Sequence, residues 1–151
     1  MKKILYIFIT ILMLGIFSGC EKQEQTTTCT IDKNTYYETQ ILRGKDKVEQ
    51  LEMTYVYDNS LFNVESLNNF TEDQKEQIKT NMLNNLGFEK TKYEGFEIII
   101  DIQDKMTVTI KIDISKADTN ITKKVGIDFS NTNLNYDEAV KSYKDIGYTC
   151  K

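Results

Sequence analysis

The chain has 151 residues, with 19 basic and 23 acidic side chains and no His, Trp or Pro. The absence of His excludes Ser–His–Asp and Cys–His catalysis as well as zinc sites with His ligands. The mildly acidic balance argues against nucleic acid as the main partner, because phosphate binding needs a concentrated basic patch.

The first twenty residues have the pattern of a bacterial lipoprotein signal. Two lysines precede the apolar run Ile4–Phe17, and Ser18-Gly19-Cys20 follows it. A charged start, a short apolar run and small residues before a cut are typical of a secretory signal. A cysteine at this point is the residue that receives a diacylglyceryl group. We therefore predict a signal peptide at 1–19 and lipidation of Cys20, although Phe17 stands where such signals most often carry Leu.

Two other interpretations of this segment stay open. A retained transmembrane helix needs about 20 apolar residues, and the run is shorter. Plain secretion would leave Cys20 as a free thiol. The lipoprotein prediction implies membrane lipid as a partner through acylated Cys20, at the extracytoplasmic face of a cell membrane of the Gram-positive type. Residues 20–25 would then be a short tether.

Removal of the signal would leave 132 residues with 17 basic and 23 acidic side chains. This length suits one domain, predicted at 26–151, and the interspersed charges favour solubility. No cofactor is expected, and the sequence names no small-molecule or protein partner.

Cys29 and Cys150 stand near the two ends of this domain. Exported proteins retain disulfides, so the two cysteines are candidates for a bridge. The chain-entropy treatment gives roughly 4–5 kcal/mol for a loop of about 120 residues. We favour a structural disulfide, because the pair does not form a Cys-x-x-Cys redox motif. Two unbridged thiols are the alternative.

Three strands are predicted in the first part of the domain, at 26–31, 35–43 and 47–57, with turn residues between them. In the third strand, apolar and polar residues alternate, which gives the strand one apolar face. The side chains on that face are Leu51, Met53, Tyr55 and Tyr57.

A helix is predicted over Thr71–Leu86. Thr71 and Gln74 fit a capping box, an apolar stripe recurs at helical spacing, and Gly87 suits a left-handed stop. The preceding segment, Asn59–Phe70, contains apolar residues in a polar setting. It is either an irregular loop under this helix or an apolar lip of a ligand groove.

Phe96–Ser115 is predicted to be a β-hairpin. Its apolar residues occupy even positions in both halves. Opposed residues must therefore sum to an even number, or one strand would turn its apolar face to solvent. A two-residue turn fails this condition. We predict the loop Gln103-Asp104-Lys105, with Ile102 opposite Met106.

A second helix is predicted over Asn135–Ile146, with Asn135 and Glu138 as a capping pair and Gly147 as the stop. The tail 148–150 would pack against the first strand if the two cysteines meet. The predicted fold class is α+β, an antiparallel sheet with two helices packed on one face.

Several short sequence motifs accompany these predicted elements along the chain. They are the lipobox cysteine, Thr28-Cys29-Thr30, Met53-Thr54-Tyr55-Val56-Tyr57, Ser115-Lys116-Ala117-Asp118 and the terminal run 144–151. Over nearly the whole mature chain this resembles the YehR-like family of small lipoproteins from low-GC Gram-positive bacteria. The resemblance implies a membrane-anchored single domain with a cysteine pair. The family's function is not characterised, so it supplies no catalytic residues.

Two groups of residues are candidates for chemistry. Asp101, Asp104 and Asp113 are weak candidates for binding a cation such as Ca²⁺. The alternative is that these carboxylates are simply solvated, and we predict no metal site.

Tyrosines suit a binding face or the edge of a core. That set is Tyr36, Tyr37, Tyr55, Tyr57, Tyr93 and Tyr136.

We predict no catalytic residues and favour a non-catalytic binding or accessory module of unknown specific activity. The alternative is an envelope enzyme, for example a hydrolase, that uses carboxylates without His.

Overall fold

The computed structural model describes residues 23–34, 36–62, 64–129 and 135–151. The predicted signal peptide and the lipidation site Cys20 lie outside these ranges. Among the described residues, no helix is both long and apolar enough to cross a membrane.

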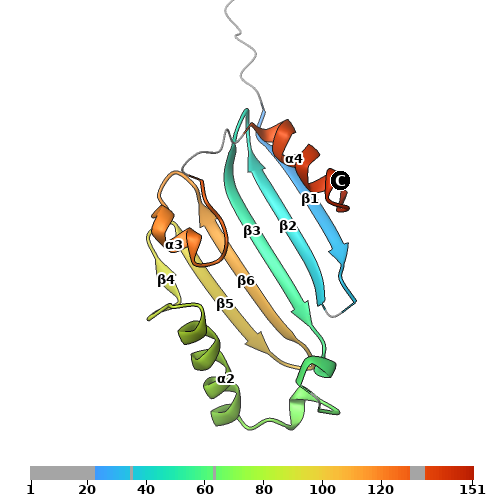
Figure 1. Ribbon diagram of the computed structural model, residues 1–151, viewed down its shortest axis with the longest axis vertical. Coiled ribbons are helices and arrows are strands. Elements are labelled where there is room, and N and C mark those ends of the chain that lie inside the picture. The colour runs from blue at the N-terminus through green and yellow to red at the C-terminus, as the bar shows by residue number, and fades with distance from the viewer. Residues whose placement is uncertain (1–22, 35, 63, 130–134) are drawn as a thin grey trace, which may run out of the picture.

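One antiparallel sheet of seven strands organises the described chain, in the order β4-β5-β6-β3-β2-β1-β7 (Figure 1). Five long strands lie between two edge strands of two residues each. The bounds are β1 Gln25–Asp32, β2 Tyr36–Gly44, β3 Val48–Tyr57, β4 Lys92–Tyr93, β5 Phe96–Ile102, β6 Met106–Asp113 and β7 Thr149–Cys150.

The predicted α+β architecture with two packed helices is wrong, because the described residues are mostly sheet and carry three short α-helices. These are α2 Glu72–Asn85, α3 Thr119–Lys123 and α4 Tyr136–Asp145. Two 3₁₀ turns, η1 Asn59–Phe62 and η2 Leu67–Asn69, precede α2. The predicted helices do form, but α2 has no buried residue, so the sheet supplies most of the core. Figure 1 shows α2 and α4 toward opposite margins of the sheet.

The predicted β5–β6 hairpin is confirmed. Ile102 pairs with Met106 and Ile100 with Val108, so three residues form the loop. The Gln103 N–H donates to the Lys105 carbonyl oxygen at 3.0 Å. This register keeps the apolar side chains of both strands on one face, as the parity argument requires.

One face of the sheet, here the inner face, carries the core. Its buried apolar side chains come chiefly from alternate positions of the four strands β2, β3, β6 and β5. They include Leu42, Leu51, Met53, Ile110, Ile112, Ile98 and Phe96.

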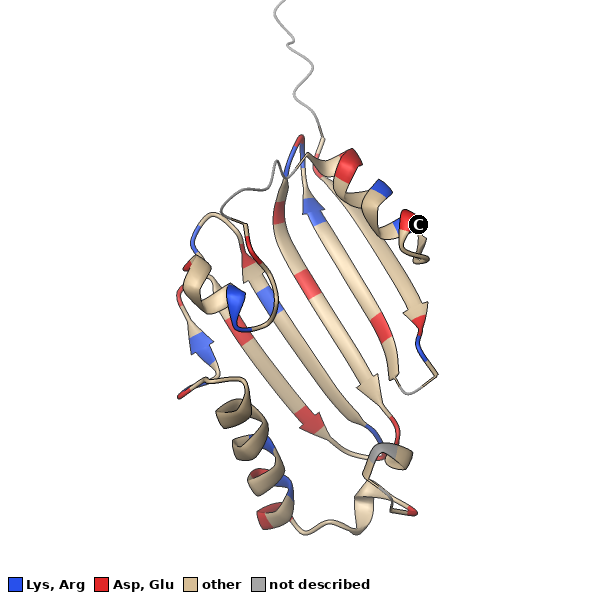
Figure 2. Ribbon diagram, viewed as in Figure 1, with Lys and Arg blue, Asp and Glu red and all other residues tan. Residues whose placement is uncertain are grey.

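The opposite face, here the outer face, is polar and rich in threonine. Pairing aligns threonines 149, 30, 39, 54 and 109 across five strands. Figure 2 shows acidic and basic residues dispersed over strands and helices rather than gathered in one patch.

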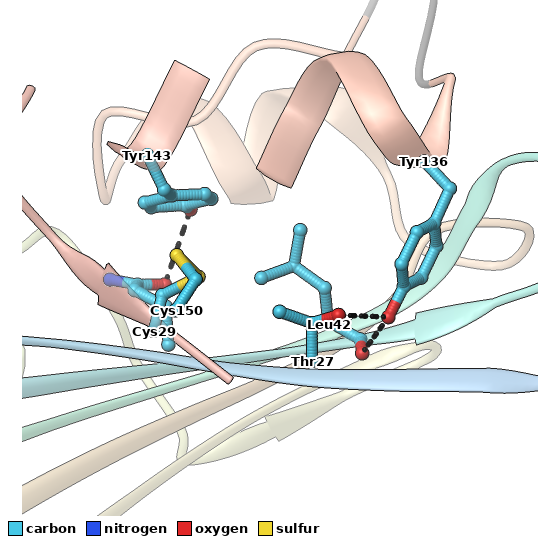
Figure 3. Close-up of a disulfide and its surroundings, with 7 residues drawn as sticks. Thr27, Cys29, Leu42, Tyr136, Tyr143 and Cys150 are labelled. Carbon is cyan, nitrogen blue, oxygen red and sulfur yellow. Dashed lines mark hydrogen bonds between the residues drawn. A yellow bond between two sulfur atoms is a disulfide. The ribbon is translucent and has the colours of Figure 1, made fainter. Parts of the chain in front are cut away.

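The two ends of the domain are joined. Cys29 and Cys150 form a disulfide between directly paired residues of β1 and β7 (Figure 3). Thr28 and Lys151 exchange both backbone hydrogen bonds, each at 2.9 Å. The predicted bridge is therefore present, and the tail becomes an edge strand beside β1.

Candidate functional site

An apolar groove of about 450 Å³ lies on the inner face, between α4 and the segment that follows α3. This volume is in the range of small-molecule sites, which are mostly apolar with a few polar groups. Its lining is Leu42, Val48, Leu51 and Met53 from the sheet, Ile114, residues 126–129, and Glu138, Ala139, Ser142, Tyr143 and Ile146 from the α4 region.

An N-cap and a buried tyrosine at the start of α4 define the helix that lines this groove. The Asn135 side chain caps the helix by accepting the Glu138 N–H at 3.1 Å. The hydroxyl of Tyr136 hydrogen-bonds the Thr27 hydroxyl and the Leu42 carbonyl oxygen, each at 3.0 Å (Figure 3). The groove wall is thereby fixed to both β1 and β2.

The rim of the groove combines an exposed apolar side chain with acidic groups. Ile146 is 63 % exposed at the end of α4. Asp128 and Glu138 also line the groove, and Asp128 forms an ion pair with Lys123 at 3.2 Å. An apolar floor with an acidic rim suits a ligand that is apolar and carries no negative charge near the rim.

A buried polar cluster lies next to the groove. Glu38 and Gln40 are 6 % and 2 % exposed on the inner face of β2. The Gln40 amide donates to a Glu38 carboxylate oxygen at 2.5 Å, and the Tyr148 hydroxyl also hydrogen-bonds this carboxylate. Tyr143 donates to the Gln40 side-chain oxygen at 3.3 Å, so a groove residue is connected to Glu38 through Gln40.

The carboxylate of Glu38 influences the tyrosines around it. Burial, the main cause, and the Glu38 charge together raise the pKa of Tyr55 and of Tyr143 to about 12. Burial and Glu38 likewise raise the pKa of Tyr148. A neutral phenol is favoured beside a buried negative charge, because ionisation would place like charges together.

Three tyrosine rings gather on the same face near Glu38. The ring centroids of Tyr36, Tyr55 and Tyr57 are 5.4–6.5 Å apart in pairs. Tyr36 pairs with Tyr57 across β2 and β3, and Glu38 pairs with Tyr55. We call Glu38 with these three residues the Glu38–tyrosine cluster.

Two solved structures share this fold at low sequence identity. An NMR structure of a Streptococcus pneumoniae TIGR4 protein matches with a TM-score of 0.59 at 15% identity, covering 87% of each chain. The NMR structure of Escherichia coli YehR matches with a TM-score of 0.62 at 12% identity, covering 86% of this chain and 92% of YehR.

The fold is YehR-like. No family model matches the chain, and no curated protein matches it. The likeness to YehR concerns the fold alone, so the site has to be argued from its own residues.

Within this YehR-like fold, the predicted tyrosines separate into different environments. Tyr36, Tyr55 and Tyr57 come together near Glu38. Tyr136, the first residue of α4, is buried against β1 and β2, and Tyr93 packs with Phe88 and Phe96. Tyr37 is 44 % exposed on the outer face.

The three aspartates considered for a cation do not converge. Asp101 lies near the hairpin loop and Asp104 in it, whereas Asp113 pairs with Gln50 toward the other end of β6. Asp113 accepts hydrogen bonds from Ser115 and Lys116 instead. In the described part of the chain, no group of three His, Cys, Asp or Glu residues is arranged to hold a metal.

Glu38, the central residue of the buried polar cluster, was not among the residues predicted from the sequence. Glu38 and Gln40 share the alternation of Tyr36 and Leu42, which was the available sign that they face inward. Residues 126–129, which line the groove, show no sequence pattern that would have indicated this position. The segment considered as an apolar lip, 59–70, instead places Leu67 in the core and does not line the groove.

Proposed function

We propose that this chain is a lipoprotein of the extracytoplasmic face of the cell membrane, acylated at Cys20. Its groove binds the acyl chain of a membrane lipid without catalysing a reaction. The observation that carries the binding role is the open apolar groove beside α4.

The position of the first residue of β1 supports a lipid as the occupant of the groove. The Gln25 side chain donates to the Lys45 carbonyl oxygen at 3.1 Å, so β1 begins beside the β2–β3 turn. Leu42 and Val48, close to this turn, line the groove. Gln25 is five positions after Cys20, a stretch that spans at most about 18 Å. An acylated Cys20 would therefore keep the groove near the bilayer surface.

The groove is tested with the soluble domain that begins after Cys20. We expect it to enhance the fluorescence of the neutral probe 1-N-phenylnaphthylamine, and a monoacylglycerol to displace the probe. Ala139→Gln places a larger polar side chain in the groove and should weaken probe binding about tenfold.

Ile99→Gln is the matched control. Ile99 is 42 % exposed on β5 and does not line the groove, so its substitution should leave probe affinity unchanged. Equal affinity in both variants would contradict the groove as the binding site.

The anchor is tested separately, by intact mass of the protein from its native membrane. A diacylglyceryl mass on Cys20 is expected, and an unmodified Cys20 would contradict the lipoprotein assignment. Cys20→Ala should release the protein from the membrane fraction.

An envelope hydrolase is the second candidate, because Asp128 and Glu138 both line the groove. Hydrolysis of a panel of nitrophenyl glycosides, lost in both Asp128→Asn and Glu138→Gln, would favour it. Binding without turnover, retained in both variants, would favour the binding module.

A further inference from the structure

We propose that the Glu38–tyrosine cluster is a recognition site for an organic ammonium group. The inference does not rest on the groove or on the lipid anchor. It rests on the burial of Glu38, on its hydrogen-bond partners and on the three tyrosine rings beside it.

Glu38 is a buried acid without a buried base. It is 6 % exposed, and within the described ranges no Lys or Arg forms an ion pair with it. Its partners are the Gln40 amide and the Tyr148 hydroxyl, which are both neutral. Buried carboxylates are normally paired with a cation or a metal, so a positive ligand group would supply the missing partner.

The rings next to Glu38 suit such a group. An ammonium is attracted to the negative face of an aromatic ring within about 6 Å of its centroid. The three tyrosines are half-buried, and their rings pack against one another. A cation therefore lies on the outward ring faces rather than between the rings, and the nearby Glu38 charge, which acts on Tyr55 and Tyr57, adds attraction.

Two tyrosines of the cluster stand at strand ends that α3 and α4 do not cross. Tyr36 is the first residue of β2 and Tyr57 the last of β3. Figure 1 shows neither helix crossing these strand ends. Metal ions of the Ca²⁺ class prefer six to eight oxygen ligands, whereas this site offers one carboxylate and ring faces, so the chemistry favours an organic cation.

The test uses the full-length chain in a neutral maltoside detergent, with tyrosine rings labelled for NMR and choline as the probe. We expect choline to shift the ring signals of Tyr36, Tyr55 and Tyr57. The neutral isostere 3,3-dimethyl-1-butanol has the same shape without the charge, and should bind at least about tenfold more weakly.

Three variants complete the test. Glu38→Gln keeps the shape and removes the charge, and should weaken choline binding at least about tenfold. Tyr57→Leu should weaken it several-fold, whereas Tyr57→Phe, which retains the ring face, should not. The two Tyr57 variants decide the question if Glu38→Gln fails to fold.

The proposal is overturned by any of three results. These are no ring shift with choline, equal affinity for choline and its neutral isostere, or equal weakening in Tyr57→Leu and Tyr57→Phe. Unchanged binding by a folded Glu38→Gln protein would also overturn it.

Discussion

At the scale of single residues, Tyr136 connects three elements through one hydroxyl. Its side chain is 2 % exposed, and its hydroxyl bonds Thr27 of β1 and the Leu42 carbonyl oxygen of β2. Tyr136→Phe would leave the Leu42 carbonyl without this donor. We expect the free energy of unfolding to fall by about 1–2 kcal/mol in urea titrations, the usual loss for a buried unsatisfied group.

Tyr37→Phe provides the comparison for this prediction. Tyr37 is on the outer face, where water replaces a lost hydroxyl contact, so the variant should change stability by less than about 0.5 kcal/mol. Equal losses in the two variants would show that the Tyr136 hydrogen bonds are not the cause.

The tyrosines around Glu38 make stability sensitive to alkaline pH. The pKa of Tyr55 and of Tyr143 is about 12 in the folded chain against 10.0 ordinarily. The unfolded chain therefore loses these protons first as pH rises. The stability that these two raised pKa values contribute to the folded chain is fully present below pH 10 and is lost as pH approaches 12.

We expect the free energy of unfolding to fall across this window, and spectrophotometric titration to show tyrosines that ionise late. Glu38→Gln should shift these tyrosines toward their ordinary pKa, since the Glu38 charge contributes to the elevation. A titration curve identical to that of the parent protein would contradict this role of Glu38.

At the scale of elements, α2 and α4 differ in how the sheet supports them. α4 buries Tyr136, whereas α2 buries no residue and is held by a half-buried stripe. In α2 the Thr71 side chain accepts the Gln74 N–H at 3.3 Å, and the Gln74 side chain accepts the Thr71 N–H at 2.9 Å. This capping box was predictable, because its two residues are close in sequence.

Thr71→Ala should therefore affect α2 more than the core. We expect a loss of about 1 kcal/mol and faster amide exchange within α2, with exchange in β3 and β6 little changed. Thr80→Ala on the same helix is the control, as Thr80 is exposed and plays no part in the cap. Unchanged exchange in α2 would contradict the importance of the cap.

Sequence patterns predicted local structure better than they predicted the architecture. The β5–β6 register followed from alternation alone, because both strands and their loop are adjacent in the chain. The β4 strand has only two residues, too few to show a period, and the equally short β7 was expected beside the first strand only because of the cysteine pair. The five-residue α3 is also shorter than two helical turns, so its apolar stripe could not be recognised.

At the scale of the whole molecule, the parts that were not predicted depend on distant pairings. β3 pairs with β6 and not with β4, the next strand in sequence. That pairing places the segment after α3 opposite α4 and so creates the groove. Periodicity along one strand carries no information about such neighbours, which is why the groove between α4 and residues 126–129 was not predicted.

The disulfide is the covalent counterpart of these distant pairings. It joins residues 121 positions apart and ties β7 to the fully buried Cys29. The bridge restricts the unfolded chain, and the entropy treatment assigns roughly 4–5 kcal/mol to a loop of this length. We expect the double variant Cys29→Ala, Cys150→Ala to lose stability of this order in urea, and its C-terminal amides to exchange rapidly.

Cys20→Ala is the matched control, since it removes a cysteine that takes no part in the bridge and should leave the urea midpoint unchanged. Reduction of the parent protein should reproduce most of the loss without any cavity at Cys29. If reduction leaves the midpoint unchanged, the backbone pairing of Thr28 with Lys151, rather than the covalent bond, holds the two ends of the domain together.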